Sequence, residues 1–86
     1  FIRDELDALG VRSRLTYNAG RTKANLFATL GEGKPSGIIL SGHTDTVPWD
    51  GQDWSVDPLG AVVRDGRLYG RGSADMKGFI ALALAQ

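Results

Sequence analysis

Cysteine is absent from this chain of 86 residues, and its ten basic residues are balanced by ten acidic ones. Without cysteine the chain forms neither a disulfide framework nor a thiolate metal site, and this composition fits a cytoplasmic protein. Because the formal net charge is zero, no basic excess predicts a nucleic-acid or membrane surface. No apolar run approaches the roughly 20 residues that cross a bilayer. We therefore expect neither nucleic acid nor membrane among the partners.

The chain is also short, since typical domains contain roughly 100–150 residues. It begins with Phe1, and the helical pattern of residues 79–86 has no glycine, asparagine or proline to end it. We expect the chain to be a piece of a longer protein and to form part of one domain.

The first half of the chain alternates between helical and extended patterns. Apolar residues recur at helical spacing in residues 1–9, which predicts an amphipathic helix. Apolar residues mostly alternate with polar ones in residues 11–17, where Ser13 is the exception, and in residues 24–30, which predicts two half-exposed strands. Glycine, proline and serine in residues 31–37 predict a loop.

The second half continues this α/β pattern. Residues 38–40 are apolar on both faces and predict a strand buried in a layered sheet. Residues 44–60 lack periodicity and predict a long loop, where functional residues are often found. Asp65 and Gly66 predict a tight hairpin turn, and the chain from Ala74 onward predicts a helix that is apolar nearly all round and therefore buried.

His43 is the only histidine, and it follows the predicted buried strand. In an extended segment His43 and Asp45 share a face, so the carboxylate can accept a hydrogen bond from one imidazole nitrogen. The other nitrogen then points outward with its lone pair free for a metal ion. A His-x-Asp pair is also common by chance, and on that alternative His43 is an ordinary strand-end residue and Asp45 begins a turn.

Asp75 follows the glycine-rich stretch of residues 70–73 at the start of the predicted helix. A dinucleotide-binding loop is excluded, because Asp75 stands where that motif needs its third glycine. Asp75 is either a first-turn acid behind an N-cap at Ser73, or a carboxylate positioned to coordinate a cation. If Asp75 reaches His43, oxygen and nitrogen ligands without sulfur favour zinc, cobalt or manganese. Its two oxygens can also bridge two ions.

Three motifs carry a resemblance to a known family. Residues 42–48 (GHTDTVP), 50–54 (DGQDW) and 68–78 (LYGRGSADMKG) resemble, in content, order and spacing, the N-terminal catalytic part of the acetylornithine deacetylase family of di-zinc amidohydrolases. Succinyl-diaminopimelate desuccinylase, carboxypeptidase G and aminoacylase-type enzymes belong to the same group. The DGQDW motif favours the deacetylases. Leu59 departs from the phenylalanine more common there, which bears on packing.

The resemblance implies a role for each matching residue. His43 would ligate one metal ion, Asp75 would bridge two Zn²⁺ ions, for which Co²⁺ can substitute, and Asp45 would orient His43 as part of the catalytic site. The implied fold is α/β: an incomplete zinc-exopeptidase-like three-layer sandwich, with a mixed sheet and flanking helices. Residues 1–86 would form the N-terminal part of the catalytic, metal-binding domain, with its remainder and any dimerisation domain elsewhere in the protein.

The implied activity is metal-dependent hydrolysis of a small N-acyl amino acid. The preferred reaction converts N-acetylornithine to ornithine and acetate in arginine biosynthesis, in a cytoplasmic protein that is a homodimer at full length. Alternatives are a related N-acyl amino acid deacylase, succinyl-diaminopimelate desuccinylase or metallopeptidase, or a non-catalytic scaffold. The family's general-base glutamate and remaining ligands lie beyond the matched region, so we expect this chain alone to be inactive and to bind metal weakly.

Other residues of the motifs are assigned no catalytic role. Trp49 and Trp54 are expected to anchor the long loop rather than to line a substrate entrance. Arg71 can meet a substrate carboxylate, but a structural ion pair or loop hydrogen bond is the preferred interpretation. Lys77 is interpreted as a solvated charge.

Overall fold

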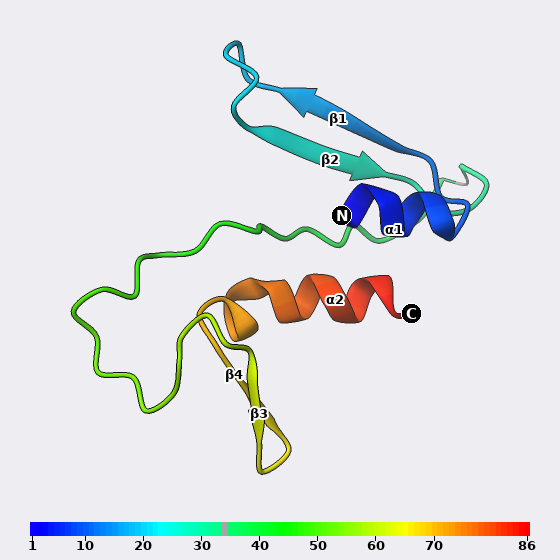
Figure 1. Cartoon of the computed structure of the whole chain (residues 1–86). Coiled ribbons are helices and arrows are strands. Elements are labelled where there is room, and N and C mark those ends of the chain that lie inside the picture. Colours follow the sequence, from blue (N-terminus) through cyan, green and yellow to red (C-terminus); the bar gives the residue numbers. More distant parts are fainter. Residues whose placement is uncertain (34) are drawn as a thin grey trace. The chain divides into compact units, whose positions relative to one another are not determined.

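The computed structural model describes residues 1–33 and 35–86, so one position of the predicted loop at 31–37 lies outside the described residues. The chain divides into two units, Phe1–Ile38 and Ile39–Gln86. Each unit contains one two-stranded antiparallel sheet and helical segments (Figure 1). None of the described helices is long and apolar enough to cross a bilayer.

The first unit is a helix packed on a hairpin. Helix α1 (Ile2–Ala8) precedes strands β1 (Ser13–Tyr17) and β2 (Ala24–Ala28), with Leu15 opposite Leu26 in the register. Both leucines are half-buried on one face of the hairpin, and α1 contacts β1. The predicted helix and the two predicted strands are therefore confirmed, each slightly shorter than its sequence pattern.

The second unit begins with an extended segment and a long loop, and described residues 39–60 contain neither helix nor strand. A hairpin of β3 (Val62–Arg64) and β4 (Arg67–Tyr69) follows. Asp65 and Gly66 both have positive φ, 51° and 71°, which is the backbone that a two-residue primed turn requires. The predicted loop and hairpin are confirmed.

The end of the second unit is only partly a regular helix. The irregular helical turn η1 (Ser73–Lys77) leads into helix α2 (Gly78–Leu84). Asp75 and Met76 have non-helical backbone angles, and the peptide bond between them is cis. The predicted regular helix from Ala74 is therefore wrong at its start and correct over α2.

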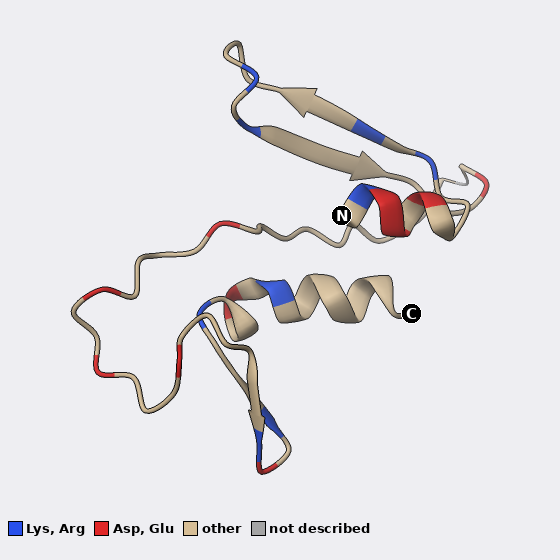
Figure 2. Ribbon diagram, in the orientation of Figure 1, with Lys and Arg blue, Asp and Glu red and all other residues tan. Residues whose placement is uncertain are grey.

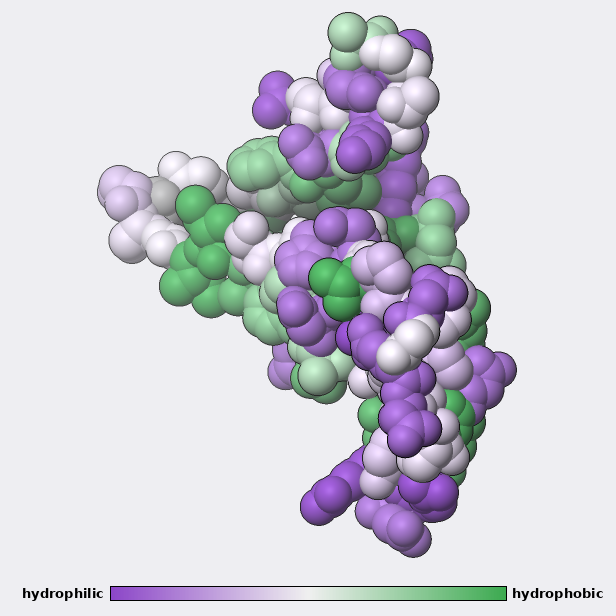
Figure 3. Space-filling model, turned by 90° about the vertical axis from the view of Figure 1, so that its left-hand side faces the viewer, coloured by the Kyte–Doolittle hydropathy of each residue, from purple (hydrophilic) through white to green (hydrophobic). Residues whose placement is uncertain are grey.

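Two predictions of burial are wrong. Ile38, Ile39 and Leu40 form no strand and are 86%, 87% and 60% exposed. A strand needs a neighbour for its backbone hydrogen bonds, and no described strand pairs with this segment. Helix α2 contains no buried residue among those described. Apolar residues are visible on the molecular surface (Figure 3).

Two glycines allow the chain to pack closely around η1. Gly42 lies against α2, since a Cβ there would stand 3.0 Å from Cγ1 of Ile80. Gly72 is buried with φ 83°, and a Cβ there would stand 2.7 Å from Cγ2 of Thr46. The segment that carries His43 and the turn that carries Asp75 therefore touch through backbone and a methyl group.

We predict that Gly72→Ala destabilises this unit by about 2–4 kcal/mol, because left-handed strain adds to overpacking against Thr46. The free energy of unfolding from urea titration measures this. Gly66→Ala is the matched control, since Gly66 has a similar φ of 71° but no described atom within 4 Å of a Cβ. It should lose only about 1–2 kcal/mol. Thr46→Ser removes Cγ2, so the Gly72→Ala/Thr46→Ser double variant should recover the extra loss of unfolding free energy that comes from overpacking. Equal losses in Gly72→Ala and Gly66→Ala would contradict the packing explanation.

Candidate metal centre

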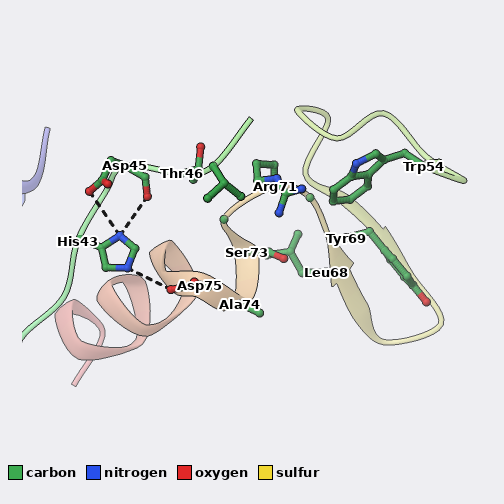
Figure 4. Close-up of a pocket in the computed structure, with 13 residues that line it drawn as sticks. His43, Asp45, Thr46, Trp54, Leu68, Tyr69, Arg71, Ser73, Ala74 and Asp75 are labelled. Atoms are coloured by element: carbon green, nitrogen blue, oxygen red, sulfur yellow. Dashed lines mark hydrogen bonds and ion pairs between the residues drawn. The ribbon is translucent and has the colours of Figure 1, made fainter. Parts of the chain in front are cut away.

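His43 and Asp75 meet although they are 32 residues apart in the chain. The extended segment before the long loop carries His43, and η1 carries Asp75. The imidazole Nε2 lies 3.1 Å from Oδ1 of Asp75 (Figure 4). The Asp75 side chain is 87% exposed and the His43 side chain 48%, so both remain accessible to a ligand.

The other imidazole nitrogen is held by the main chain of Asp45. Nδ1 of His43 lies 3.0 Å from the backbone carbonyl oxygen of Asp45 and 3.5 Å from its carboxylate. The carboxylate contact is the longer of the two, so the orienting role of the Asp45 carboxylate stays a prediction. The Asp45 carboxylate is 93% exposed.

The contact with the Asp45 carbonyl indicates which imidazole nitrogen of His43 carries a hydrogen. A carbonyl oxygen only accepts, so Nδ1 carries a hydrogen and donates it to Asp45. In the neutral ring Nε2 then presents a lone pair to Asp75, and an ionised carboxylate oxygen also offers only lone pairs. A cation placed between these two atoms, which lie 3.1 Å apart, would be bound by both, because each offers it a lone pair.

The position of Asp75 does not depend on helix capping. The residue that precedes η1 is Gly72, and its left-handed backbone starts the turn with no side-chain cap hydrogen bond among the described residues. The backbone N–H of Lys77 donates to the Gly72 carbonyl at 2.8 Å and closes the turn over Asp75. The structure therefore does not show Ser73 as a cap, whereas Asp75 does lie in the first turn of η1, with non-helical backbone angles.

A pocket of about 390 Å³ opens beside this pair. It is lined by His43, by residues 45–47, by Trp54 and by residues 68–75 (Figure 4). Its wall therefore combines all three motifs of the sequence: the His43 segment, the long loop and the glycine-rich turn.

The loop is attached to the pocket through Arg71. Its guanidinium donates to Oε1 of Gln52 and lies 5.1 Å from the centre of the Trp54 ring. The preferred interpretation of Arg71 as a loop hydrogen bond is confirmed, and so is the anchoring of Trp54. No role was predicted for Gln52; the available signal was its position inside the DGQDW motif, beside a tryptophan predicted to anchor the loop.

The donor set fits part of a zinc or cobalt site. Zinc bonds of about 2.0–2.2 Å to nitrogen and oxygen place tetrahedral ligands roughly 3.3 Å apart, close to the 3.1 Å between Nε2 and Oδ1. A free Nε2 lone pair fixed by a bonded Nδ1 is also what a metal-binding histidine needs. Among the described residues, no group of three or more His, Cys, Asp or Glu side chains converges on one point. His43 and Asp75 thus fit two positions of a four-coordinate site.

The chain also resembles known proteins. It is 48% identical over 80 residues to acetylornithine deacetylase of Pasteurella multocida, covering 92% of this chain and 21% of that protein. It is 56% identical over 62 residues to acetylornithine deacetylase of Photorhabdus laumondii, covering 72% of this chain and 16% of that protein. It is 52% identical over 64 residues to acetylornithine deacetylase of Shigella sonnei, covering 74% of this chain and 16% of that protein.

The chain therefore spans about a fifth or less of the length of these relatives. No solved structure matches it. Residues 39–86, which make up more than half of the chain and coincide with its second unit, match the profile of Peptidase family M20/M25/M40. The chain belongs to Peptidase family M20/M25/M40.

Proposed function

We propose that this chain supplies part of the metal-binding active site of an amide hydrolase that removes the acetyl group from N-acetylornithine. The observation that carries the proposal is the 3.1 Å approach of the His43 Nε2 to the Asp75 carboxylate, beside a pocket. The matching family is a peptidase family, and the relatives are named acetylornithine deacetylases. Both names concern hydrolysis of an amide bond.

Each site residue has a distinct task in this proposal. His43 and Asp75 would hold the metal, and Asp75 would be the ligand shared by two Zn²⁺ or Co²⁺ ions. Asp45 orients His43, mainly through its backbone carbonyl, which accepts the Nδ1 hydrogen. The chemistry that a metal ion would supply there is Lewis-acid polarisation of a carbonyl and activation of water near neutral pH. The pocket of about 390 Å³ is in the size range of sites for small molecules, which suits an N-acyl amino acid.

The protein around this chain is part of the same proposal. Residues 1–86 form the N-terminal part of a catalytic domain with a mixed sheet between helix layers, and further ligands and a general base come from the rest of that domain. The complete protein is a cytoplasmic homodimer that acts in arginine biosynthesis. The exposed residues 38–40 and the apolar surface of α2 support this arrangement, since both are surfaces that other parts of a domain can cover.

A peptide is the second candidate substrate. The matching family is one of peptidases, whose substrates are also amides. Both substrates need the same His43–Asp75 site, so assays with each substrate separate the candidates.

In the complete protein, we predict that His43→Ala and Asp75→Asn each lower kcat/KM for N-acetylornithine by more than about 100-fold. Loss of groups that merely orient a metal ligand already costs roughly 10–100-fold. Asp45→Asn should have a smaller effect, because the backbone carbonyl that contacts Nδ1 remains. Colorimetric measurement of released ornithine tests this.

A chelator should abolish the same activity, and Zn²⁺ or Co²⁺ should restore it. Activity that survives both the chelator and His43→Ala would contradict the proposed site. Metal-dependent cleavage of dipeptides without deacetylation would favour the peptidase instead.

For the 86-residue chain by itself, we predict weak metal binding and no measurable deacetylation. Two ligands leave a four-coordinate zinc site half complete, and no larger ligand group is present among the described residues. Isothermal titration with Zn²⁺ should show no tight, stoichiometric site. Tight binding of one ion, abolished by His43→Ala, would show that this chain completes a site by itself.

A further inference from the structure

Arg71 connects the long loop to the turn that carries Asp75. Residues 44–60 contain four aspartates and no lysine or arginine, and Figure 2 shows acidic positions spaced along this loop. The Arg71 guanidinium, which lies in the wall of the pocket, brings a positive charge to this acidic segment.

Three contacts make the attachment. Nη2 of Arg71 donates to Oε1 of Gln52, and the guanidinium lies 5.1 Å from the centre of the Trp54 ring. The backbone N–H of Arg71 donates to the Pro58 carbonyl at 2.6 Å. We call these four residues, Gln52, Trp54, Pro58 and Arg71, the Arg71 clamp. It uses both the side chain and the main chain of one residue.

The clamp acts on a short stretch of chain. Arg71 immediately precedes Gly72, which packs against Thr46 three residues beyond His43. Four residues after Arg71 comes Asp75, inside a turn closed by the Lys77–Gly72 hydrogen bond. Within the segment from Arg71 to Asp75, the loop therefore holds Arg71, and the next residue, Gly72, packs against the His43 segment.

The contacts of the guanidinium favour a structural task over substrate binding. Its partners are a neutral amide and an aromatic ring of the loop. Its Nε is buried and has no hydrogen-bond partner among the described residues, so this nitrogen is shielded from a ligand entering from solvent. The planar fork of arginine suits this simultaneous bonding and stacking, which lysine reproduces only in part.

We propose that Arg71 is a positioning residue: through Gln52 and Trp54 it fixes the turn that places the Asp75 carboxylate opposite His43. This inference rests on the proposed metal site, because the expected effect of the clamp is a change in metal binding at that site. Gln52 belongs to the same device, since its amide is the acceptor that Arg71 uses. Neither residue touches the metal or the substrate.

The test uses the complete protein loaded with Co²⁺, whose visible absorption spectrum reports ligand geometry. Arg71→Met and Gln52→Leu should each weaken Co²⁺ binding about 10–100-fold, as loss of groups supporting metal ligands does, and should change the spectrum. The double variant should be no worse than Arg71→Met, because the two residues act as one unit. Arg71→Lys should recover part of the affinity. Thermal unfolding confirms that each variant is folded.

Arg64→Met is the matched control. It removes another guanidinium stacked on an aromatic ring of the same unit, 5.0 Å from the centre of Tyr69, without a contact to the loop. Its Co²⁺ affinity and spectrum should stay at the wild-type values. If Arg71→Met fails to fold, Gln52→Leu, at an exposed position, decides the question.

Two failures are distinguishable. If folded Gln52→Leu and Arg71→Met bind Co²⁺ with wild-type affinity and spectrum while His43→Ala does not, the positioning role is wrong and the metal site stands. If His43→Ala also binds Co²⁺ like the wild type, the proposed function itself is wrong.

Discussion

The approach of the His43 imidazole to the Asp75 carboxylate constrains the surrounding structure. With Nδ1 bonded to the Asp45 carbonyl, Nε2 presents a lone pair towards an oxygen that also carries lone pairs, an arrangement suited to holding a cation. Such a geometry must be enforced by neighbouring backbone. In the positioning role proposed for Arg71, the contact of Gly72 with Thr46 and the Arg71 clamp supply this support within residues 39–86.

Local structure was predictable because its determinants are close together in the chain. The apolar spacing of residues 1–9 and the Asp65–Gly66 turn each specify their element within a few residues. The failed predictions concern burial. Residues 38–40 and α2 have the composition of interior elements, but burial depends on distant segments that lie against them, and a local pattern contains no information about those neighbours.

The site shows the same division between local and distant information. Residue type and motif spacing were enough to select His43 and Asp75, whose side chains are adjacent in the structure. The atom that holds Nδ1 was not predictable, because the choice between the carbonyl and carboxylate of Asp45 depends on backbone angles rather than on residue identity. Gln52 was missed for a related reason. Its role depends on the hydrogen bond from Arg71, a contact between distant residues that the local sequence does not reveal.

The exposure of the apolar residues has a thermodynamic consequence. No hydrophobic side chain among the described residues is fully buried, and Ile39 and Leu82 are 87% and 67% exposed. The heat-capacity increase on unfolding comes from apolar surface that water newly reaches. A chain whose apolar surface is already largely hydrated gains little heat capacity on unfolding, so its stability varies almost linearly with temperature, without the pronounced curvature of a well-packed domain.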